Sequence, residues 1–181
     1  SAAYDAVRDV IYVSNYDGYN PSVDQDEQFI SRLASDGTIK DLQWVRGVRN
    51  PTGVAVFGDL LYVVEPTGLL EIDIESAQIK QRYSAPGAMM LNDVVVDPQG
   101  NAYVSDSAGN VIFRFANGRW EEWLRGAEIS RPNGLIIQGE KLYVGNNGDG
   151  CLKSVDLQTK VITTIANLGP GLIDGLGIDE A

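Results

Sequence analysis

Leu91-Asn92-Asp93-Val94 is one of four related phrases in the chain, and the other three are Pro51-Thr52-Gly53-Val54, Pro132-Asn133-Gly134-Leu135 and Ile173-Asp174-Gly175-Leu176. The final residues of the four phrases are spaced by 40, 41 and 41 positions. A second phrase, Tyr-Val, begins at Tyr12, Tyr62, Tyr103 and Tyr143, with spacings of 50, 41 and 40. Two independent phrases with one period indicate a structural repeat of about forty residues.

Each repeat contains several short runs of strand-forming residues. In the second repeat these runs lie at 54–56, 60–63, 69–74 and 78–83, and in the third repeat turn-forming clusters lie at 97–101, 107–110 and 117–118. No segment has a sustained helical period. A β-sandwich would not produce this regular repeat, whereas four antiparallel strands in about forty residues are typical of a propeller blade.

We therefore expect an all-β protein, a β-propeller of about four blades in a single partial domain. The predicted blades span 1–49, 50–89, 90–130 and 131–170, and a fifth begins at 171–181. An orphan inner strand would leave an unpaired sheet edge, so we expect a fragment of a larger propeller. Open blade faces at both ends predict self-association or docking of further blades.

Composition excludes several classes of function. The 181 residues carry a formal net charge of −11, which disfavours nucleic acids and anionic membranes as partners. Histidine is absent and Cys151 is the only cysteine, so a Ser-His-Asp triad, an imidazole metal site and a cysteine zinc cluster are all excluded. Any chemistry must come from carboxylates, amides and a bound hard cation.

The repeat predicts where the polar side chains converge. In a propeller the first strand of each blade lines the axis, and the second residues of the four phrases are Thr52, Asn92, Asn133 and Asp174. The second strands end on the same face, in Asn15, Glu65, Asp106 and Asn146. A single Asn-Gly or Asp-Gly pair is usually a turn, but four equivalent polar positions point to a binding site.

This set of oxygen atoms predicts a divalent cation. Two carboxylates about 4 Å apart repel by roughly 4 kcal/mol at an effective dielectric constant near 20, and a cation between them removes that cost. Oxygen ligands favour calcium first and magnesium or manganese next, while zinc is less favoured.

The chain resembles the family of senescence marker protein, gluconolactonase and luciferin-regenerating enzyme, whose members are six-bladed propellers with one divalent metal on the axis. The similarity covers essentially the whole chain and rests on several phrases, which are Asp9–Asn15, Phe29–Leu33 with Asp36-Gly37, Leu91–Val94, Arg131–Leu135 and Asp174–Leu176. It implies a metal-dependent hydrolase that opens a sugar lactone or related ester. The compartment implied is the periplasm or the exterior of the cell, with the cytoplasm as the alternative.

The resemblance also implies roles for individual residues. Asn133 and Asp174 match the metal-binding asparagine and aspartate of the family, and Asp174 would also be the general base. Asn92, followed by Asp93, matches the asparagine that faces the small-molecule substrate. The third protein ligand of the family, a glutamate, aligns immediately before Ser1, so we expect little turnover from the chain as given.

Two alternatives remain open at this stage. One is a phosphotriesterase-like or arylesterase-like hydrolase, and the other is a propeller that serves as a binding scaffold without catalysis. An acidic insertion at Tyr16–Glu27, between the second and third strands of the first repeat, is predicted to be either a lid over the site or a solvated loop.

Overall fold

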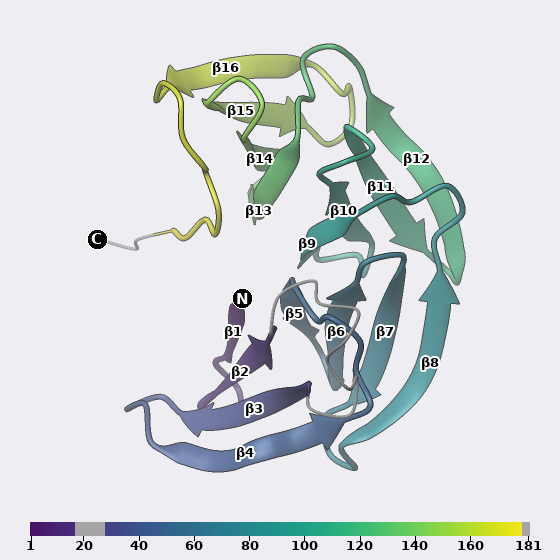
Figure 1. The fold of residues 1–181 in the computed structure, drawn as a ribbon, viewed down its shortest axis with the longest axis vertical. Helices are drawn as coiled ribbons and strands as arrows, with labels where there is room; N and C mark the ends of the chain where they lie inside the picture. The colour runs from purple at the N-terminus through teal and green to yellow at the C-terminus, as the bar shows by residue number, and fades with distance from the viewer. Residues whose placement is uncertain (17–27, 179–181) are drawn as a thin grey trace. The chain divides into compact units, whose positions relative to one another are not determined.

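The structure is a computed structural model that describes residues 1–16 and 28–178, so most of the predicted lid lies outside the described residues. The described residues form sixteen β-strands and no helix, and thus contain no helix able to cross a membrane. The strands make four antiparallel sheets of four, each following chain order (Figure 1). The prediction of an all-β chain with four strands per repeat is confirmed.

The first compact unit, Ser1–Ala88, contains two of these sheets. The strands of the first sheet are β1 (Ala2–Asp5), β2 (Val10–Asn15), β3 (Phe29–Ala34) and β4 (Ile39–Arg46). Those of the second sheet are β5 (Val54–Phe57), β6 (Leu60–Glu65), β7 (Gly68–Asp73) and β8 (Gln78–Ser84).

The second compact unit, Met89–Ala181, contains the other two sheets. The strands of the third sheet are β9 (Leu91–Val96), β10 (Ala102–Asp106), β11 (Val111–Ala116) and β12 (Arg119–Arg125). Those of the fourth are β13 (Pro132–Gln138), β14 (Lys141–Asn146), β15 (Cys151–Asp156) and β16 (Ile162–Asn167). Residues 171–178, which follow β16, form no strand.

The recurring Tyr-Val phrase explains how the sheets of one unit pack. Neighbouring residues on a strand point to opposite faces, so the tyrosine and the valine of each phrase face different neighbours. In the first unit Tyr12 and Val63 belong to one buried cluster, and in the second Tyr103 and Val144 do. Each cluster combines residues of two successive sheets, so a tyrosine of one sheet and a valine of the next build the same core.

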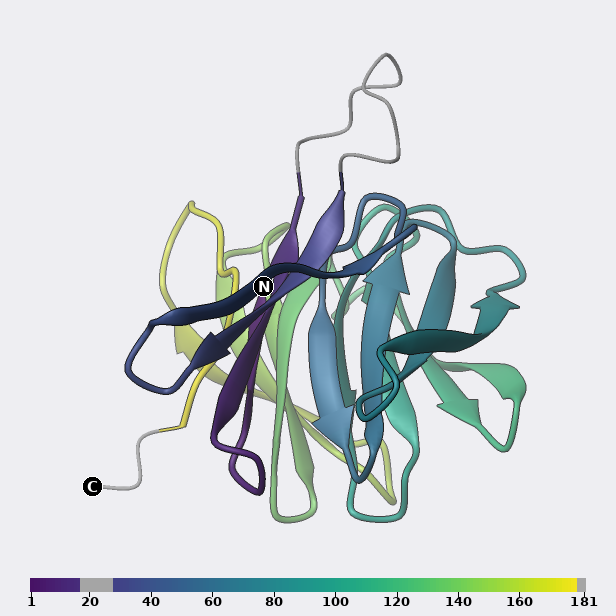
Figure 2. The ribbon, with the colours of Figure 1, turned by 90° about the horizontal axis from the view of Figure 1, so that it is seen from below.

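Short turns join the strands within each sheet. Asn117 and Gly118, which connect β11 and β12, have φ angles of 51° and 74°, the left-handed pair that a tight hairpin of this type requires. The turn between β9 and β10 is held by the carboxylate of Asp97, which accepts the N–H groups of Gln99 and Asn101. Figure 2 shows such turns at the ends of the strands.

Candidate functional site

Three of the predicted site residues of the second unit, Asn92, Asp93 and Asn133, lie at two equivalent β-bulges. In the pairing of β9 with β10, Asn92 and Asp93 together oppose the single residue Ser105. In the pairing of β13 with β14, Asn133 and Gly134 together oppose Gly145. A bulge bends its strand and redirects the side chains it carries, and bulges are frequent next to functional sites. The repeat thus places a distortion of the same kind at the start of both inner strands.

Two hydrogen bonds join these bulges to each other. The carboxylate Oδ2 of Asp93 accepts the main-chain N–H of Leu135 at 2.9 Å. The hydroxyl of Ser105, which is fully buried, accepts the N–H of Asp93 at 3.0 Å and donates to the carbonyl of Asn133 at 2.8 Å. The strand starts that carry Asp93 and Asn133 are therefore fixed side by side.

The segment that carries Asp174 lies against the start of β13 and the end of β14. A Cβ atom on Gly134 would meet the main-chain oxygen of Asp174 at 1.7 Å, and one on Gly145 would meet Cγ2 of Ile173 at 2.6 Å. Only glycine permits contacts this close. Figure 1 shows the same segment, in yellow, running from β16 towards β13. Asp174 itself is exposed to solvent.

Several of the predicted site residues carry a polar atom without a partner. Six buried side-chain atoms among the described residues make no hydrogen bond to the protein, and three of them are Thr52 Oγ1, Asn133 Oδ1 and Asn146 Oδ1. A buried oxygen without a partner costs about 1–3 kcal/mol. Asn133 is 8% exposed, so its oxygen is a natural acceptor for a ligand that would remove this cost.

Ionisation of the carboxyl group of Asp93 is less favourable than that of a carboxyl group in water. Removal from water raises its pKa to about 6, against the opposing effect of the main-chain N–H groups of Leu135 and Val94. The negative charge of Asp174 contributes to the raised pKa of Asp93 to a smaller extent. A cation bound between them would favour the charged form of both.

The residues that end the second strands have partners in the preceding loops. Asp106 is fully buried and accepts the N–H groups of Met89, Met90 and Gly109 at 2.7–2.9 Å. Glu65 accepts the N–H of Arg49 at 2.7 Å. These carboxylates tie the loop that enters a sheet to the second strand of that sheet, and their contact with a substrate stays a prediction.

The two amides at the equivalent positions have different partners. Asn146 donates to the carbonyl of Glu128 at 2.8 Å, in the loop that enters the fourth sheet. Asn15, at the end of β2, donates to the hydroxyl of Ser31 at 2.8 Å. The side-chain oxygen of Asn146 accepts no hydrogen bond, although its NH₂ group has a partner.

Thr52, the member of the predicted ring in the first unit, lies directly before β5. Its N–H donates to Val64 at 3.0 Å, and its carbonyl accepts the hydroxyl of Ser14 at 2.6 Å. The bond from Ser14 to Thr52 repeats the bond from Ser105 to Asn133 of the second unit, so the repeat conserves the local framework of the strand start.

The residues of the second unit fit a hard cation by their chemistry. Asn133 offers an unpaired buried oxygen, while Asp93 and Asp174 offer carboxylates. Oxygen ligands of this kind suit calcium, with magnesium or manganese as alternatives. Across residues 1–16 and 28–178, no group of three or more His, Cys, Asp or Glu side chains is placed to hold a metal ion. Asp93, Asn133 and Asp174 do not make a group of that kind, because Asn133 contributes an amide oxygen.

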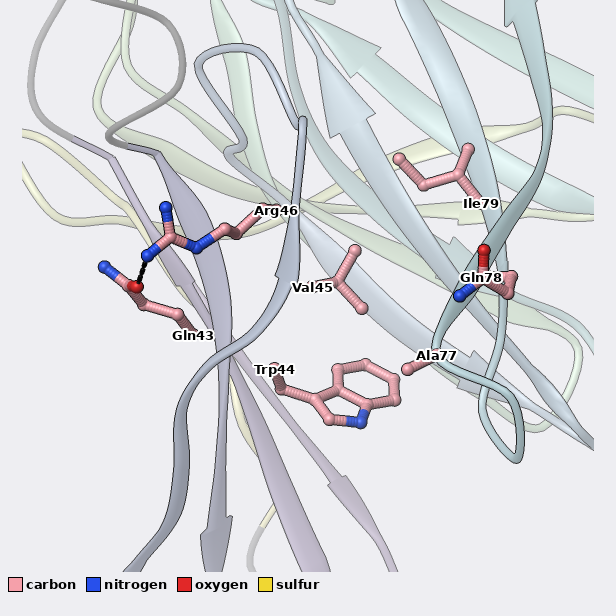
Figure 3. Close-up of a pocket in the computed structure, with 7 residues that line it drawn as sticks. All are labelled: Gln43, Trp44, Val45, Arg46, Ala77, Gln78 and Ile79. Atoms are coloured by element: carbon pink, nitrogen blue, oxygen red, sulfur yellow. Dashed lines mark hydrogen bonds between the residues drawn. The ribbon is translucent and has the colours of Figure 1, made fainter.

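Cavities elsewhere in the described residues offer different surroundings. In the first unit a cavity of about 430 Å³ is lined by Gln43–Arg46 of β4 and by Ala77–Ile79 (Figure 3). None of these seven residues carries a carboxylate, so the cavity has no anionic ligand for a cation. In the second unit a cavity of about 300 Å³ is mainly apolar, with Tyr143, Leu152 and Leu176 in its lining. Self-association through the open blade faces stays a prediction.

Comparison with known proteins identifies the fold. No protein-family profile matches the chain, and no curated protein matches it at a significant level. A selenomethionine-substituted virginiamycin B lyase from Staphylococcus aureus is similar, with a TM-score of 0.68 and 15% identity over 90% of this chain and 54% of that one. The four sheets are blades of a β-propeller. The propeller prediction is thereby confirmed.

Two further structures are similar to this propeller. A streptogramin B lyase gives a TM-score of 0.64 with 16% identity, covering 86% of this chain and 50% of that one. The computationally designed protein Ika4 gives a TM-score of 0.57 with 12% identity, covering 72% of this chain and 80% of that one. The chain spans about half the length of the two lyases. At these identities the likeness shows the fold alone.

Two residues that build the site were not predicted from the sequence. Ser105 joins the two bulges, and Asn147 accepts the N–H of Ile173 at 2.6 Å. The spacing gave one usable signal, because Ser14 and Ser105 occupy the same place before the last residue of the second strand. No periodic signal marks Asn147, which lies beyond the end of β14.

Proposed function

We propose that this chain contributes four blades to a metal-dependent hydrolase of the gluconolactonase type, which opens a sugar lactone or related ester. The observation that carries the proposal is the buried, unpaired Oδ1 of Asn133, fixed beside the desolvated carboxyl group of Asp93 and the segment of Asp174. Asn133 and Asp174 are also the residues that match the metal-binding positions of the resembled family. The physical environment supports Asn133 directly, and for Asp174 it supports the position of the main chain next to Gly134.

The residues have distinct roles in this proposal. Asn133 and Asp174 would hold a divalent cation, calcium first, which would supply a Lewis acid for the carbonyl of the substrate. Asp174 accepts a proton from the attacking water, a role for which its exposure to solvent is suitable. Asn92 and Asp93 contact the substrate next to the cation. The ring C–O bond of the lactone then breaks, and its oxygen takes up a proton to leave as an alcohol.

The second-strand carboxylates support the inner strands of their own sheets. Asp106 and Glu65 hold the loops that lead into β9 and β5, so they fix where those inner strands begin. Thr52 and Asn146 retain unpaired oxygens and are the further candidates for contact with substrate.

The names of the similar structures suggest a second activity to test. The two lyases are named for virginiamycin B and streptogramin B, and they share the propeller fold with this chain. A test panel for the whole protein therefore includes virginiamycin B beside sugar lactones, an aryl ester and a phosphotriester. A scaffold without catalysis would bind a cation and turn over none of them.

The experiment uses the chain for cation binding and the whole protein that carries it for turnover. We expect calcium to bind the chain, and we expect Asp174→Asn to lower kcat/KM for lactone hydrolysis by about 10³-fold, the usual contribution of a general base. Circular dichroism controls for the fold of the variant. Undiminished lactone hydrolysis by Asp174→Asn contradicts the proposed base, and turnover of virginiamycin B alone contradicts the proposed substrate class.

A further inference from the structure

Asn147 contacts both segments that carry the proposed cation ligands. It lies directly after β14, and its main-chain N–H donates to the carbonyl of Arg131 at 3.0 Å, two residues before Asn133. Its side-chain Oδ1 accepts the N–H of Ile173 at 2.6 Å, directly before Asp174. A single residue therefore links two segments that are far apart in the sequence.

The segment of Asp174 needs such a link. Residues 172–178 form no strand, so the main-chain ladder that fixes the register of a β-strand is missing. The glycines at 134 and 145 let this segment approach closely, but a glycine surface places no side-chain anchor on it. The bond from Ile173 to Asn147 supplies a directional contact at the residue next to Asp174.

We propose that Asn147 is a positioning residue, which fixes Asp174 beside Asn133 by accepting the main-chain N–H of Ile173. Its importance for cation binding rests on the proposed function, whereas the contact itself needs no cation. This role requires an acceptor oxygen on the side chain at position 147. The main-chain bond to Arg131 is independent of the side chain, so a substitution at position 147 leaves that part of the turn intact.

The chain offers a conservative variant and a matched control. Asn147→Asp keeps the acceptor oxygen, whereas Asn147→Ala removes it. Asn167 provides the control because its Oδ1 accepts the N–H of Gly169 at 3.0 Å, a bond of the same kind in the same unit. Asn167→Ala removes that bond without touching Ile173.

The test combines amide hydrogen exchange by NMR, nuclear Overhauser contacts between Gly134 and Asp174, and calorimetric titration with calcium. In Asn147→Ala we expect exchange of the Ile173 amide to be at least 10-fold faster, the contact between Gly134 and Asp174 to weaken, and calcium binding to fall about 10-fold. Asn147→Asp restores the exchange protection and the contact. Asn167→Ala accelerates exchange of the Gly169 amide and leaves the other readouts unchanged.

Each outcome decides the proposal. Unchanged exchange of the Ile173 amide in Asn147→Ala overturns it, and so does faster exchange with the Gly134 contact and the calcium affinity both retained. If the wild-type chain binds no calcium, the proposed function fails, while the exchange and Overhauser data still decide the role of Asn147. If Asn147→Ala does not fold, Asn147→Gln, which moves the acceptor by one methylene group, serves the same comparison.

Discussion

Asp106 and Asp93 lie in the same sheet, but their surroundings differ. Asp106 has the contacts of a structural residue, whereas Asp93 has the surroundings of a binding-site residue. Asp106 is fully buried, and its carboxylate accepts three main-chain N–H groups from Met89, Met90 and Gly109. Asp93 lies in a bulge, where burial raises the pKa of its carboxyl group, and the neighbouring Asn133 has an unpaired oxygen. Burial alone does not distinguish these two residues; what differs is that the carboxylate of Asp106 is fully bonded, whereas the site of Asp93 keeps an unpaired oxygen at Asn133.

The largest expected effect concerns the satisfied carboxylate. Asp106→Ala leaves three N–H groups without their acceptor, and we expect it to lower the free energy of unfolding by about 4 kcal/mol. Urea denaturation followed by circular dichroism measures this. Asp174→Ala is the control, because Asp174 is exposed and should tolerate the change without measurable loss. A loss below about 1 kcal/mol in Asp106→Ala would contradict the structural role assigned to Asp106.

A smaller effect is expected at the unsatisfied amide. Asn133→Ala removes an unpaired oxygen, so we expect little change in the stability of the calcium-free chain and at least a 100-fold loss of calcium affinity, or about 2.7 kcal/mol. Calorimetric titration measures the affinity. Asn101→Ala is the matched control, since its amide donates to Asp97 at 2.7 Å in the turn before β10. Equal calcium affinity in wild type and Asn133→Ala would contradict the role of this oxygen.

The pH dependence of stability should distinguish Asp93. Its pKa is about 6 in the folded chain and has the ordinary value near 4 in the unfolded chain, so the folded state binds the proton more tightly. The contribution of Asp93 to the stability of the calcium-free chain is therefore full below pH 4 and falls by about 2 kcal/mol as the pH rises from 4 to 6. Asp93→Asn should lack this fall and be more stable than wild type at pH 7.

Chemical denaturation at pH 4, 6 and 7 tests this prediction, with saturating calcium as a second condition. Calcium should remove most of the advantage of the variant, because a bound cation favours the charged form of Asp93. An identical pH profile for wild type and Asp93→Asn would argue against desolvation of this carboxyl group.

The sequence allowed the strands to be predicted, for a physical reason, while the convergence of all the inner strand starts stays a prediction. A repeat places equivalent residues equivalently, so the spacing of Tyr12, Tyr62, Tyr103 and Tyr143 was enough to define successive sheets. The ends of the second strands at Asn15, Glu65, Asp106 and Asn146 are likewise as predicted.

The chemical state of the predicted residues could not be read in the same way. The spacing treats Asp106 and Asn146 alike, although the carboxylate of Asp106 is fully bonded and the amide oxygen of Asn146 is not. That difference depends on local contacts, because Met89 and Met90 donate main-chain N–H groups to Asp106, whereas the loop before β13 offers Asn146 the carbonyl of Glu128. The bulges at Asn92-Asp93 and Asn133-Gly134 were also not predicted, because a bulge depends on the pairing of two strands.

The most direct test of the central claim is a crystal structure of the chain soaked in calcium, with anomalous diffraction data recorded at long wavelength. We predict one strong anomalous peak 2.3–2.6 Å from Asn133 Oδ1 and from a carboxylate oxygen of Asp174, the usual range for calcium and oxygen ligands. Asn92 and Asp93 should border the same peak. No peak at Asn133, or peaks only at other acidic side chains on the surface, would contradict the account.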